Sequence, residues 1–396
     1  MAAWRMLALL AGAEFLGMSL WFGANAVAPE LRSQWGLNES QAGWLTAVVQ
    51  VGFVAGTASA ALLNLADIFS ARYYFAASAT LAALSNGLLL VVPDYSMALG
   101  ARFATGFFLA GVYPPAMKMV ATWFQSRRGL AIGTLIAALT VGKALPYLIR
   151  SFSLTADTIL LIASAGAVIA AFLVLAAYRD GPFPFGRRPF SWGLALTVVR
   201  HRPTRLATLG YLGHMWELYA MWTWIPAFLA ASAVARGSGA SAGVIDLAAF
   251  LSIAAGGAGC VWGGWIASRW GYPRVVTVAM VISGLVSLFI GFAFGTSFWL
   301  LVPLAMVWGF FIVADSAQFS SMITEVTPSH AVGTALTIQT SLGFLLTMVT
   351  IQLVPVFARA LGWQWAFLVL ALGPAAGIAA IRRLTRVSAI SHPSIV

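Results

Sequence analysis

Twelve long apolar stretches, each about as long as a bilayer is thick, divide this chain. A helix needs about 20 apolar residues to cross the hydrocarbon core of a membrane. Short loops separate the stretches, and only 8% of all residues are charged. We therefore predict an all-α membrane protein with twelve transmembrane helices, at residues 4–28, 41–64, 73–93, 95–122, 129–150, 155–178, 206–231, 242–267, 274–295, 298–324, 331–357 and 364–382.

The distribution of positive charge predicts how the chain lies in the membrane. The net charge of +11 is not a nucleic-acid signal, because the basic residues lie in the short loops between apolar stretches. Alternate loops carry fifteen arginines on one side, against Arg32, Arg150, Arg236 and Arg359 on the other. Loops rich in Lys and Arg stay in the cytoplasm. We expect a multi-pass protein of the cell (inner) membrane with both termini cytoplasmic.

Two halves of the chain resemble each other. Gln41-Ala42-Gly43 returns as Ser241-Ala242-Gly243, and Gly106-Phe107-Phe108 returns as Gly309-Phe310-Phe311. The longest interruption lies between the predicted sixth and seventh helices. We therefore divide the chain into a six-helix bundle at 1–178, a cytoplasmic linker at 179–205 and a second six-helix bundle at 206–396. Repeated halves joined by a linker are typical of secondary transporters.

One polar loop occurs in both halves, 201 positions apart. Its first copy runs from Leu63 to Arg72 and includes Leu65-Ala66-Asp67; its second runs from Gly264 to Arg274 and has Ser268 in place of the acid. Both copies resemble the signature between the second and third helices of the major facilitator superfamily, Gly-x-Leu-Ala-Asp-Arg-x-Gly-Arg-Arg. The resemblance implies two six-helix bundles that open alternately to the two sides. It also implies an inner gate, formed here by Asp67, Arg72, Arg127, Arg128, Arg269 and Arg274.

Three acidic residues lie near the middle of predicted helices. A charge inside a bilayer costs about 2.5–3.5 kcal/mol on insertion scales, so each needs a reason. Glu14 shares a helix face with Met18, Trp21 and Asn25, and Glu217 shares one with His214. Asp315 lies in the inner half of the tenth helix. In the superfamily that the chain resembles, helices one, four, seven and ten line the central cavity, so these acids predict a proton or cation site there.

Two basic residues also fall inside apolar stretches. Arg102, followed four residues later by Gly106, is similar to the helix-four motif of proton-coupled family members. Lys143 lies at comparable depth in the fifth helix. We expect them to hold an anionic group of the substrate or to act on Glu14, with the long Arg102 side chain or a water bridging to that acid. Lys118 is expected to snorkel toward the membrane surface instead.

The charged and aromatic residues inside the predicted helices favour a transport function. The predicted substrate and proton site comprises Glu14, Trp21, Asn25, Arg102, Lys143, His214, Glu217 and Asp315, with aromatic walls from Trp216, Tyr219, Trp222 and Trp224. No nucleotide-binding motif is present, so an ion gradient is the expected energy source. We find no complete set of catalytic residues, and we predict no enzyme, cofactor or resident metal. Ser241 lies in a sequence that fits the nucleophile elbow of hydrolases, but we interpret it as the cap of a helix. The expected partners are a small-molecule substrate, protons and the lipid bilayer, without nucleic acid, and we expect a monomer.

The main prediction is proton-coupled transport of a small organic solute by alternating access. Three alternatives stay open. One is a drug–proton antiporter, although Gly142-Lys143-Ala144-Leu145-Pro146 lacks the Gly-Pro dipeptide that such members carry in helix five. Another is a divalent-metal exporter that uses Glu14, His214, Glu217 and Asp315. The last is a channel, against which the repeat and the midplane charges argue.

Overall fold

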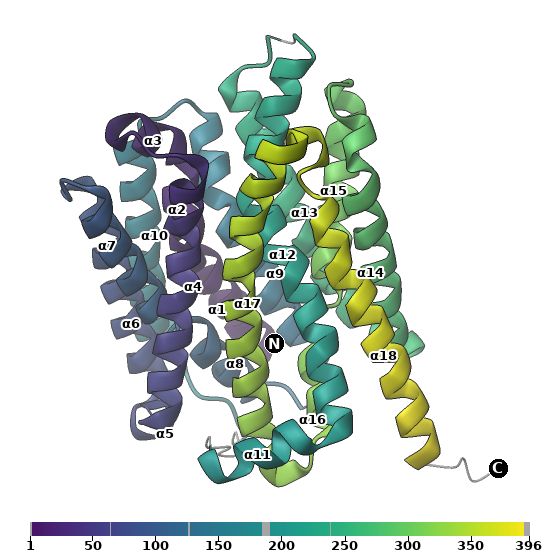
Figure 1. The fold of residues 1–396 in the computed structure, drawn as a ribbon. Coiled ribbons are helices and arrows are strands. Elements are labelled where there is room, and N and C mark those ends of the chain that lie inside the picture. The colour runs from purple at the N-terminus through teal and green to yellow at the C-terminus, as the bar shows by residue number, and fades with distance from the viewer. Residues whose placement is uncertain (1, 64, 126, 184–190, 238, 392–396) are drawn as a thin grey trace.

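The computed structural model describes residues 2–63, 65–125, 127–183, 191–237 and 239–391, and these residues form helices and short connections without a strand (Figure 1). The first half contains α1 (Ala2–Gly17), η1 (Met18–Phe22), α2 (Gly23–Ala26), α3 (Ala28–Trp35), α4 (Glu39–Leu62), α5 (Leu65–Ile68), α6 (Ala71–Gly87), η2 (Leu88–Leu90), α7 (Tyr95–Leu109), α8 (Tyr113–Ala121), α9 (Arg128–Ser151) and α10 (Ala156–Ala177). The second contains α11 (Trp192–Arg200), α12 (Arg202–Ala235), α13 (Ala242–Trp270), α14 (Tyr272–Phe289), η3 (Ile290–Ala293), α15 (Phe298–Ala314), α16 (Ser316–Val326), η4 (Ser329–Ala331), α17 (Val332–Leu361), η5 (Trp363–Trp365), η6 (Leu368–Ala371) and α18 (Leu372–Ser391).

The all-α membrane fold is confirmed. In the described part of the chain, eleven helical segments are long and apolar enough to cross a membrane. The predicted fourth span, 95–122, is instead two shorter helices, α7 and α8, because the chain turns at Ala110–Val112 and Pro114 and Pro115 begin a new helix. Pro fits the first turn of a helix, where its missing N–H has no helical partner to lose. Together α7 and α8 fill the predicted fourth span and, with the eleven continuous segments, complete the predicted set of twelve.

Helix starts follow the sequence signals. Asn38 caps α4, accepting a 2.9 Å hydrogen bond from the Gln41 backbone while the Gln41 side chain accepts one from the Asn38 backbone. Ser241 caps α13 through the Val244 backbone N–H at 3.4 Å, as predicted. Such caps satisfy backbone donors that have no partner within the helix.

Two further predicted helices, besides the fourth span, are not continuous α-helices. The first stretch, 4–28, breaks into α1, η1 and α2, and the tenth, 298–324, breaks at Asp315 between α15 and α16. The counterpart of the first stretch in the second half, α12, runs unbroken for 34 residues. A break leaves backbone carbonyl groups without helical partners, so other groups must bind them.

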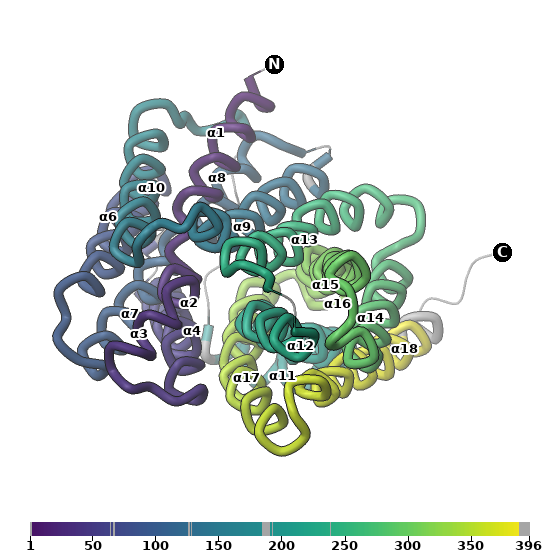
Figure 2. Tube along the Cα trace, turned by 90° about the horizontal axis from the view of Figure 1, so that it is seen from above, coloured from purple at the N-terminus to yellow at the C-terminus, as the bar shows by residue number. Residues whose placement is uncertain are grey.

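Viewed along the bundle, the helices of the first half gather on one side and those of the second half on the other (Figure 2). The halves meet where α9 packs on α13 and α4 packs on α17. Close approach needs glycine at both ends of the α9–α13 seam: a Cβ on Gly243 would lie 2.6 Å from the Ser151 carbonyl oxygen, and one on Gly264 3.3 Å from the Gly129 oxygen. Small residues let membrane helices approach this closely.

The two ends of the bundle differ. At the end that carries α3, Ser40 donates a 2.6 Å hydrogen bond to Gln352, and Arg150 lies 3.5 Å from Asp246. Both contacts join the first half to the second. The opposite end carries α5 and α11 (Figure 1), and there the backbone N–H of Ser191 donates to Thr334 at 3.1 Å. We call these the α3 end and the α11 end.

Candidate substrate and proton site

Glu14 is a buried carboxyl group without a hydrogen-bond partner. It lies in the last turn of α1, and its exposed fraction is 0%. Within the described part of the chain, neither carboxyl oxygen receives a hydrogen bond. An unpartnered buried polar group costs about 1–3 kcal/mol, more when charged. Lys143 is the basic side chain that interacts with it electrostatically, and the Tyr113 hydroxyl in α8 is also within electrostatic reach.

Lys143 in α9 places its ammonium group inside an aromatic cage. Its Nζ lies 3.9 Å from the Trp21 ring centroid, 4.7 Å from that of Tyr219 and 5.4 Å from that of Trp222. It also donates a hydrogen bond to the Tyr219 hydroxyl. Trp21 belongs to η1 and the other two rings to α12, so both halves build this cage. A desolvated cation over aromatic faces gains about 2 kcal/mol or more.

Further polar atoms around the cage lack partners. In the described residues, the indole N–H groups of Trp21 and Trp222, the Tyr147 hydroxyl and the whole Gln50 amide make no hydrogen bond. Tyr147 follows Lys143 by one turn of α9, and Gln50 precedes Phe53, whose ring centroid lies 5.1 Å from that of Trp21. Most buried polar groups in proteins are satisfied. This cluster at the interface between the halves therefore suits a polar ligand.

Arg102 supports the broken first helix. It is fully buried in α7 and donates to the carbonyl oxygens of Leu20 at 2.9 Å, of Leu45 at 3.2 Å and of Trp21. It also donates to Asn86 Oδ1 at 3.3 Å. Arg102 makes no direct hydrogen bond to Glu14, because its guanidinium group binds carbonyl oxygens in and beside η1 instead.

Asn25 also ties the first helix to its neighbour. Its Oδ1 accepts a 2.6 Å hydrogen bond from Thr46 in α4. The side chain of Asn25 is buried, and this bond joins α2 to α4 within the first half.

Glu217 has two donors, in contrast to Glu14. Trp308 Nε1 donates to Oε1 at 2.6 Å, and Ser283 Oγ donates to Oε2 at 2.8 Å. These partners come from α15 and α14, so the carboxyl group points into the second half. Tyr219, two residues further along α12, faces Lys143 on another side of the helix, so Glu217 lies apart from this part of the predicted aromatic wall.

Trp216 and Trp224 are engaged elsewhere. The Trp216 indole donates to the Val369 carbonyl oxygen at 3.0 Å, and that of Trp224 to the Ile351 oxygen at 2.8 Å. Both bonds lie within the second half. The aromatic walls predicted from sequence are therefore split, with Trp21, Tyr219 and Trp222 at the cage and these two indoles away from it.

His214 and Asp315 form a separate buried pair. Nδ1 lies 2.9 Å from Asp315 Oδ1, and Nε2 lies 3.1 Å from Ser316 Oγ. The contact joins α12 to the junction of α15 and α16. Among the described residues, no three His, Cys, Asp or Glu side chains come together as metal ligands would. Glu14, Glu217 and this pair make different contacts, so the geometry does not support the divalent-metal alternative.

The four predicted inner-gate residues whose side chains the structure describes make no hydrogen bond or ion pair with one another. Arg72 donates to the neighbouring Tyr73 hydroxyl at 2.8 Å, and Arg269 lies 4.5 Å from the centroid of its own helix neighbour Trp265. Arg127 is exposed at the start of α9, with a left-handed φ of 61°, and Arg274 lines a groove between α14 and α18. The side chains of Asp67 and Arg128 lie outside the described residues. The gate remains a prediction.

Several residues at these contacts were missed in the sequence. Trp308, Ser283 and Asn86 bind the predicted charges, and Gln50 and Tyr147 border the cage. Asn86 and Gln50 could have been found from the sequence, because they are polar residues inside apolar stretches. Nothing in the sequence separated Trp308, which binds Glu217, from the many other tryptophans.

Comparison with known proteins agrees with this architecture. The family model described as Major Facilitator Superfamily matches residues 10–235. The MFS transporter asaE of Aspergillus flavus is 26% identical over 288 residues, which are 68% of this chain and 60% of that protein. This chain thus matches only about 60% of the length of that curated relative.

Solved transporter structures share the fold at low sequence identity. A bacterial homologue of the human lysosomal transporter Spinster, inward-facing and unoccupied, superimposes with a TM-score of 0.76 at 14% identity, covering 97% of both chains. A single-residue mutant of the nucleoside transporter NupG gives 0.74 at 15%, covering 96% of this chain and 99% of its own. FucP in the outward conformation gives 0.67 at 17%, with coverages of 96% and 98%. Since the family model covers more than half of the sequence and the fold agrees over nearly all of it, this chain belongs to the major facilitator superfamily and is a multi-pass membrane transporter, not an enzyme.

Proposed function

We propose that this transporter moves a small organic solute carrying a carboxylate together with a proton. The observation that carries the proposal is the buried pair of Lys143 and Glu14 beside the aromatic cage, at the interface of the two halves. Lys143 would bind the carboxylate, and Glu14 would carry the proton. The aromatic rings of Trp21, Tyr219 and Trp222 would contact the organic part of the solute.

Charge balance explains the coupling. In this proposal, Lys143 is positively charged and Glu14 negatively charged when substrate is absent, and the two charges compensate each other in a low-dielectric interior. When a carboxylate neutralises Lys143, the Glu14 carboxylate is left buried without compensation, which is costly. Taking up a proton removes that charge. Substrate binding and protonation of Glu14 therefore favour each other, as coupled transport requires.

The unpartnered donors favour a substrate rich in acceptor atoms. The indole N–H groups of Trp21 and Trp222, whose rings face the Lys143 ammonium group, have no hydrogen-bond partner among the described residues, and neither has the Tyr147 hydroxyl one turn further along α9. A carboxylate with neighbouring hydroxyl groups offers oxygen atoms to all of them, and hydrogen bonds to a charged acceptor are about twice as strong as neutral ones. A hydroxylated carboxylate is thus the substrate class that fits best.

Alternating access would come from the two halves turning about the interface of α4, α9, α13 and α17. The polar contacts at the α3 end, Ser40 with Gln352 and Arg150 with Asp246, would have to break for that end to open. The loops richest in arginine belong to the α11 end, which we assign to the cytoplasm together with both termini. We propose a monomer in the cell membrane.

A second function is favoured by the cage itself. Aromatic rings around an ammonium group also suit an organic cation. If the Lys143 ammonium left the cage, a cationic drug could replace it and exchange for a proton on Glu14. This is the antiport alternative, and the substrate screen below distinguishes it.

The proposal is tested with purified protein in liposomes that contain a pH-sensitive dye. Gluconate and quinate serve as hydroxylated carboxylates, their amides as neutral analogues and tetraphenylphosphonium as an organic cation. We expect only the carboxylates to raise the melting temperature and to move protons inward with them. Stabilisation by tetraphenylphosphonium alone would favour antiport, and stabilisation by the amides alone would refute the role of Lys143.

Glu14→Gln tests the coupling site. We expect at least a tenfold loss of substrate accumulation driven by a proton gradient, while exchange of internal for external substrate persists, because the amide cannot carry the proton. Glu217→Gln is the matched control, since that acid lies at the corresponding place in the second half and has its own donors. Accumulation that survives Glu14→Gln with unchanged pH dependence would exclude Glu14.

A further inference from the structure

A groove lies on the outer rim of the second half, between α14 and α18. It has a volume of about 510 Å³ and is lined by Trp270, Pro273, Arg274, Thr277, Val278, Ile381, Arg382 and Thr385. Figure 2 places α14 and α18 at the edge of the bundle, away from the first half. A groove there faces the surrounding lipid rather than the path between the halves.

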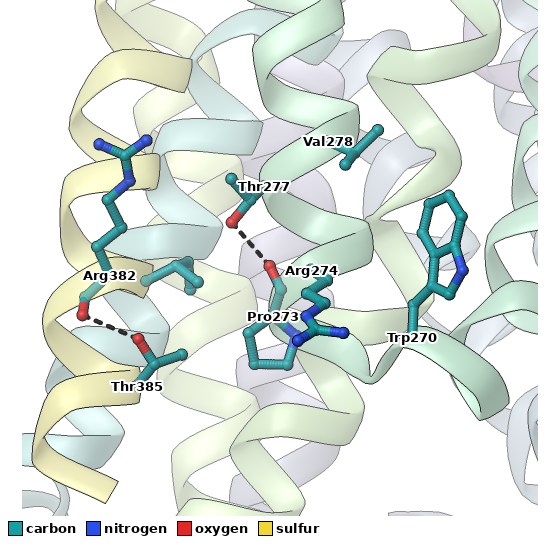
Figure 3. Close-up of a pocket in the computed structure, with 8 residues that line it drawn as sticks. Trp270, Pro273, Arg274, Thr277, Val278, Arg382 and Thr385 are labelled. Atoms are coloured by element: carbon teal, nitrogen blue, oxygen red, sulfur yellow. Dashed lines mark hydrogen bonds between the residues drawn. The ribbon is translucent and has the colours of Figure 1, made fainter. Parts of the chain in front are cut away.

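The polar chemistry of the groove is that of two arginines. Figure 3 shows Arg274 rising from α14 and Arg382 from the facing α18, with Trp270 at the far edge. No acidic side chain is among the lining residues. In the part of the chain that the structure describes, no hydrogen bond or ion pair engages either guanidinium group. In Figure 3 the two guanidinium groups point in different directions, so one anion between them requires these long side chains to turn toward it; Arg binds phosphate oxygens well.

The two hydroxyl groups in the groove are already engaged. Thr277 donates to the Pro273 carbonyl oxygen at 2.7 Å, and Thr385 donates to the Arg382 carbonyl oxygen at 2.9 Å (Figure 3). They leave the arginines as the free donors. The walls between them are apolar, from Val278, Ile381 and the Trp270 ring, which is 43% exposed.

The position along the helices fits an amphiphile. Arg274 stands in the first turn of α14, and Arg382 stands near the end of the apolar span that closes the chain, so both lie at the α11 end. Val278 lies one turn further into the α14 span than Arg274. A ligand with an anionic head and an apolar body matches this order, and basic pockets between membrane helices bind acidic lipid head groups.

We propose that this groove is a binding site for an anionic phospholipid, with its phosphate held by Arg274 and Arg382 and its acyl chains along Val278 and the exposed Trp270 ring. The groove lies away from the aromatic cage and from the interface between the two halves. A soluble phosphate shares the head-group chemistry but leaves the apolar walls uncovered, so an experiment distinguishes the two sources.

The test uses the full-length protein in a neutral detergent with equimolar phosphatidylglycerol and phosphatidylcholine of identical acyl chains. Native mass spectrometry counts the lipids retained. We expect phosphatidylglycerol to be preferred, with the preference falling about fivefold in R382Q and further in R274Q/R382Q, because each arginine near a membrane surface contributes roughly that factor. R383Q is the matched control, since Arg383 is equally exposed but does not line the groove.

Three outcomes would overturn the proposal. The first is equal retention of both lipids by the unmodified protein. The second is the same loss in R383Q as in R382Q, which would indicate general surface charge. The third is complete displacement of phosphatidylglycerol by millimolar inorganic phosphate, which would show a site for small anions. Retained preference in R383Q and in phosphate, with loss in R382Q, supports the lipid site even if the double variant is unstable.

Discussion

The two halves of this transporter carry a glutamate at the same place but use it differently. Glu14 and Glu217 stand 203 positions apart, as do Arg102 and Ala305. In the first half the helix breaks after Glu14, Arg102 binds the carbonyl oxygens of the break, and the carboxyl group has no donor. In the second half α12 is continuous, Ala305 replaces the arginine, and Trp308 and Ser283 bind the carboxyl group.

The difference shows how a repeated unit separates two tasks. A carboxyl group held by two donors is fixed in place and contributes to packing among α12, α14 and α15. In the proposed mechanism, one without donors, beside a buried lysine, gains or loses a proton when that lysine changes partner. Trp21 lies in η1, where the first helix breaks, and its ring faces Lys143. The irregular backbone of η1 therefore forms part of the aromatic cage. Four substitutions test this contrast.

Arg102→Met has the largest expected effect. It removes the donor shared by three backbone carbonyl oxygens and leaves them buried, and each hydrogen bond from a charged donor contributes about 1.5–3 kcal/mol. We expect a loss of about 3–5 kcal/mol in the free energy of unfolding, measured by denaturation in detergent. Ala305→Met at the corresponding place in the second half is the control for a change in packing. A loss no larger than in the control would mean that the break supports itself.

Lys143→Met comes next. Removing one member of a buried charge pair leaves the other uncompensated, and this typically costs about 3 kcal/mol or more. We expect the double variant Glu14→Gln/Lys143→Met to recover most of that stability, because neither charge remains. Melting temperatures of the four proteins give the interaction energy. Strictly additive losses would show that the two residues do not compensate each other.

Glu217→Gln should have a moderate effect on stability and a small one on coupling. The amide keeps one acceptor for Trp308 or Ser283 but places its NH₂ group against the other donor, so we expect a loss of about 1–2 kcal/mol. Transport per folded molecule should stay within about threefold of the unmodified protein. Trp308→Phe removes one donor from the other side and should not add fully to the loss. Abolished proton coupling in Glu217→Gln would make the two halves equivalent.

Ser268→Ala should have the smallest effect. Ser268 takes the place of Asp67 in the second copy of the repeated loop, is exposed, and donates only to the Trp265 carbonyl oxygen at 2.8 Å. A surface substitution of this kind changes stability by about 0.5 kcal/mol or less. Asp67→Asn is the comparison, and we expect it to lower uptake clearly if the gate is asymmetric. Equal effects of both changes on uptake would contradict that asymmetry.

The sequence predicted the fold because the bilayer restricts the choices. Apolar stretches of fixed length, a cap such as Ser241 and repeated loops left few architectures, and the structure agrees with the predicted spans within a few residues at most ends. Local backbone geometry was harder. The breaks at Met18 and Asp315 depend on contacts from other helices, and the only warning for the α7–α8 break was the Pro114-Pro115 pair.

The candidate site was predicted in part for the same reason. Composition alone marks Glu14, Lys143 and Glu217 as unusual, because charge inside a membrane is costly. Which charge meets which partner depends on the rotation of each helix about its axis. A turn of about 200° separates Glu217 from Tyr219, two residues later, and so sends one into the second half and the other toward Lys143.

The sequence by itself therefore determined the helical membrane fold, its repeat and the residues that must be explained, because hydrophobic length and buried charge are properties of local composition. Only the tertiary structure decided that Arg102 binds backbone carbonyls, that Lys143 sits among Trp21, Tyr219 and Trp222, and that Glu14 lacks the donors that Glu217 has. These outcomes follow from how helices distant in the chain pack against one another. Contacts between distant helices are not encoded in the local pattern of any one helix.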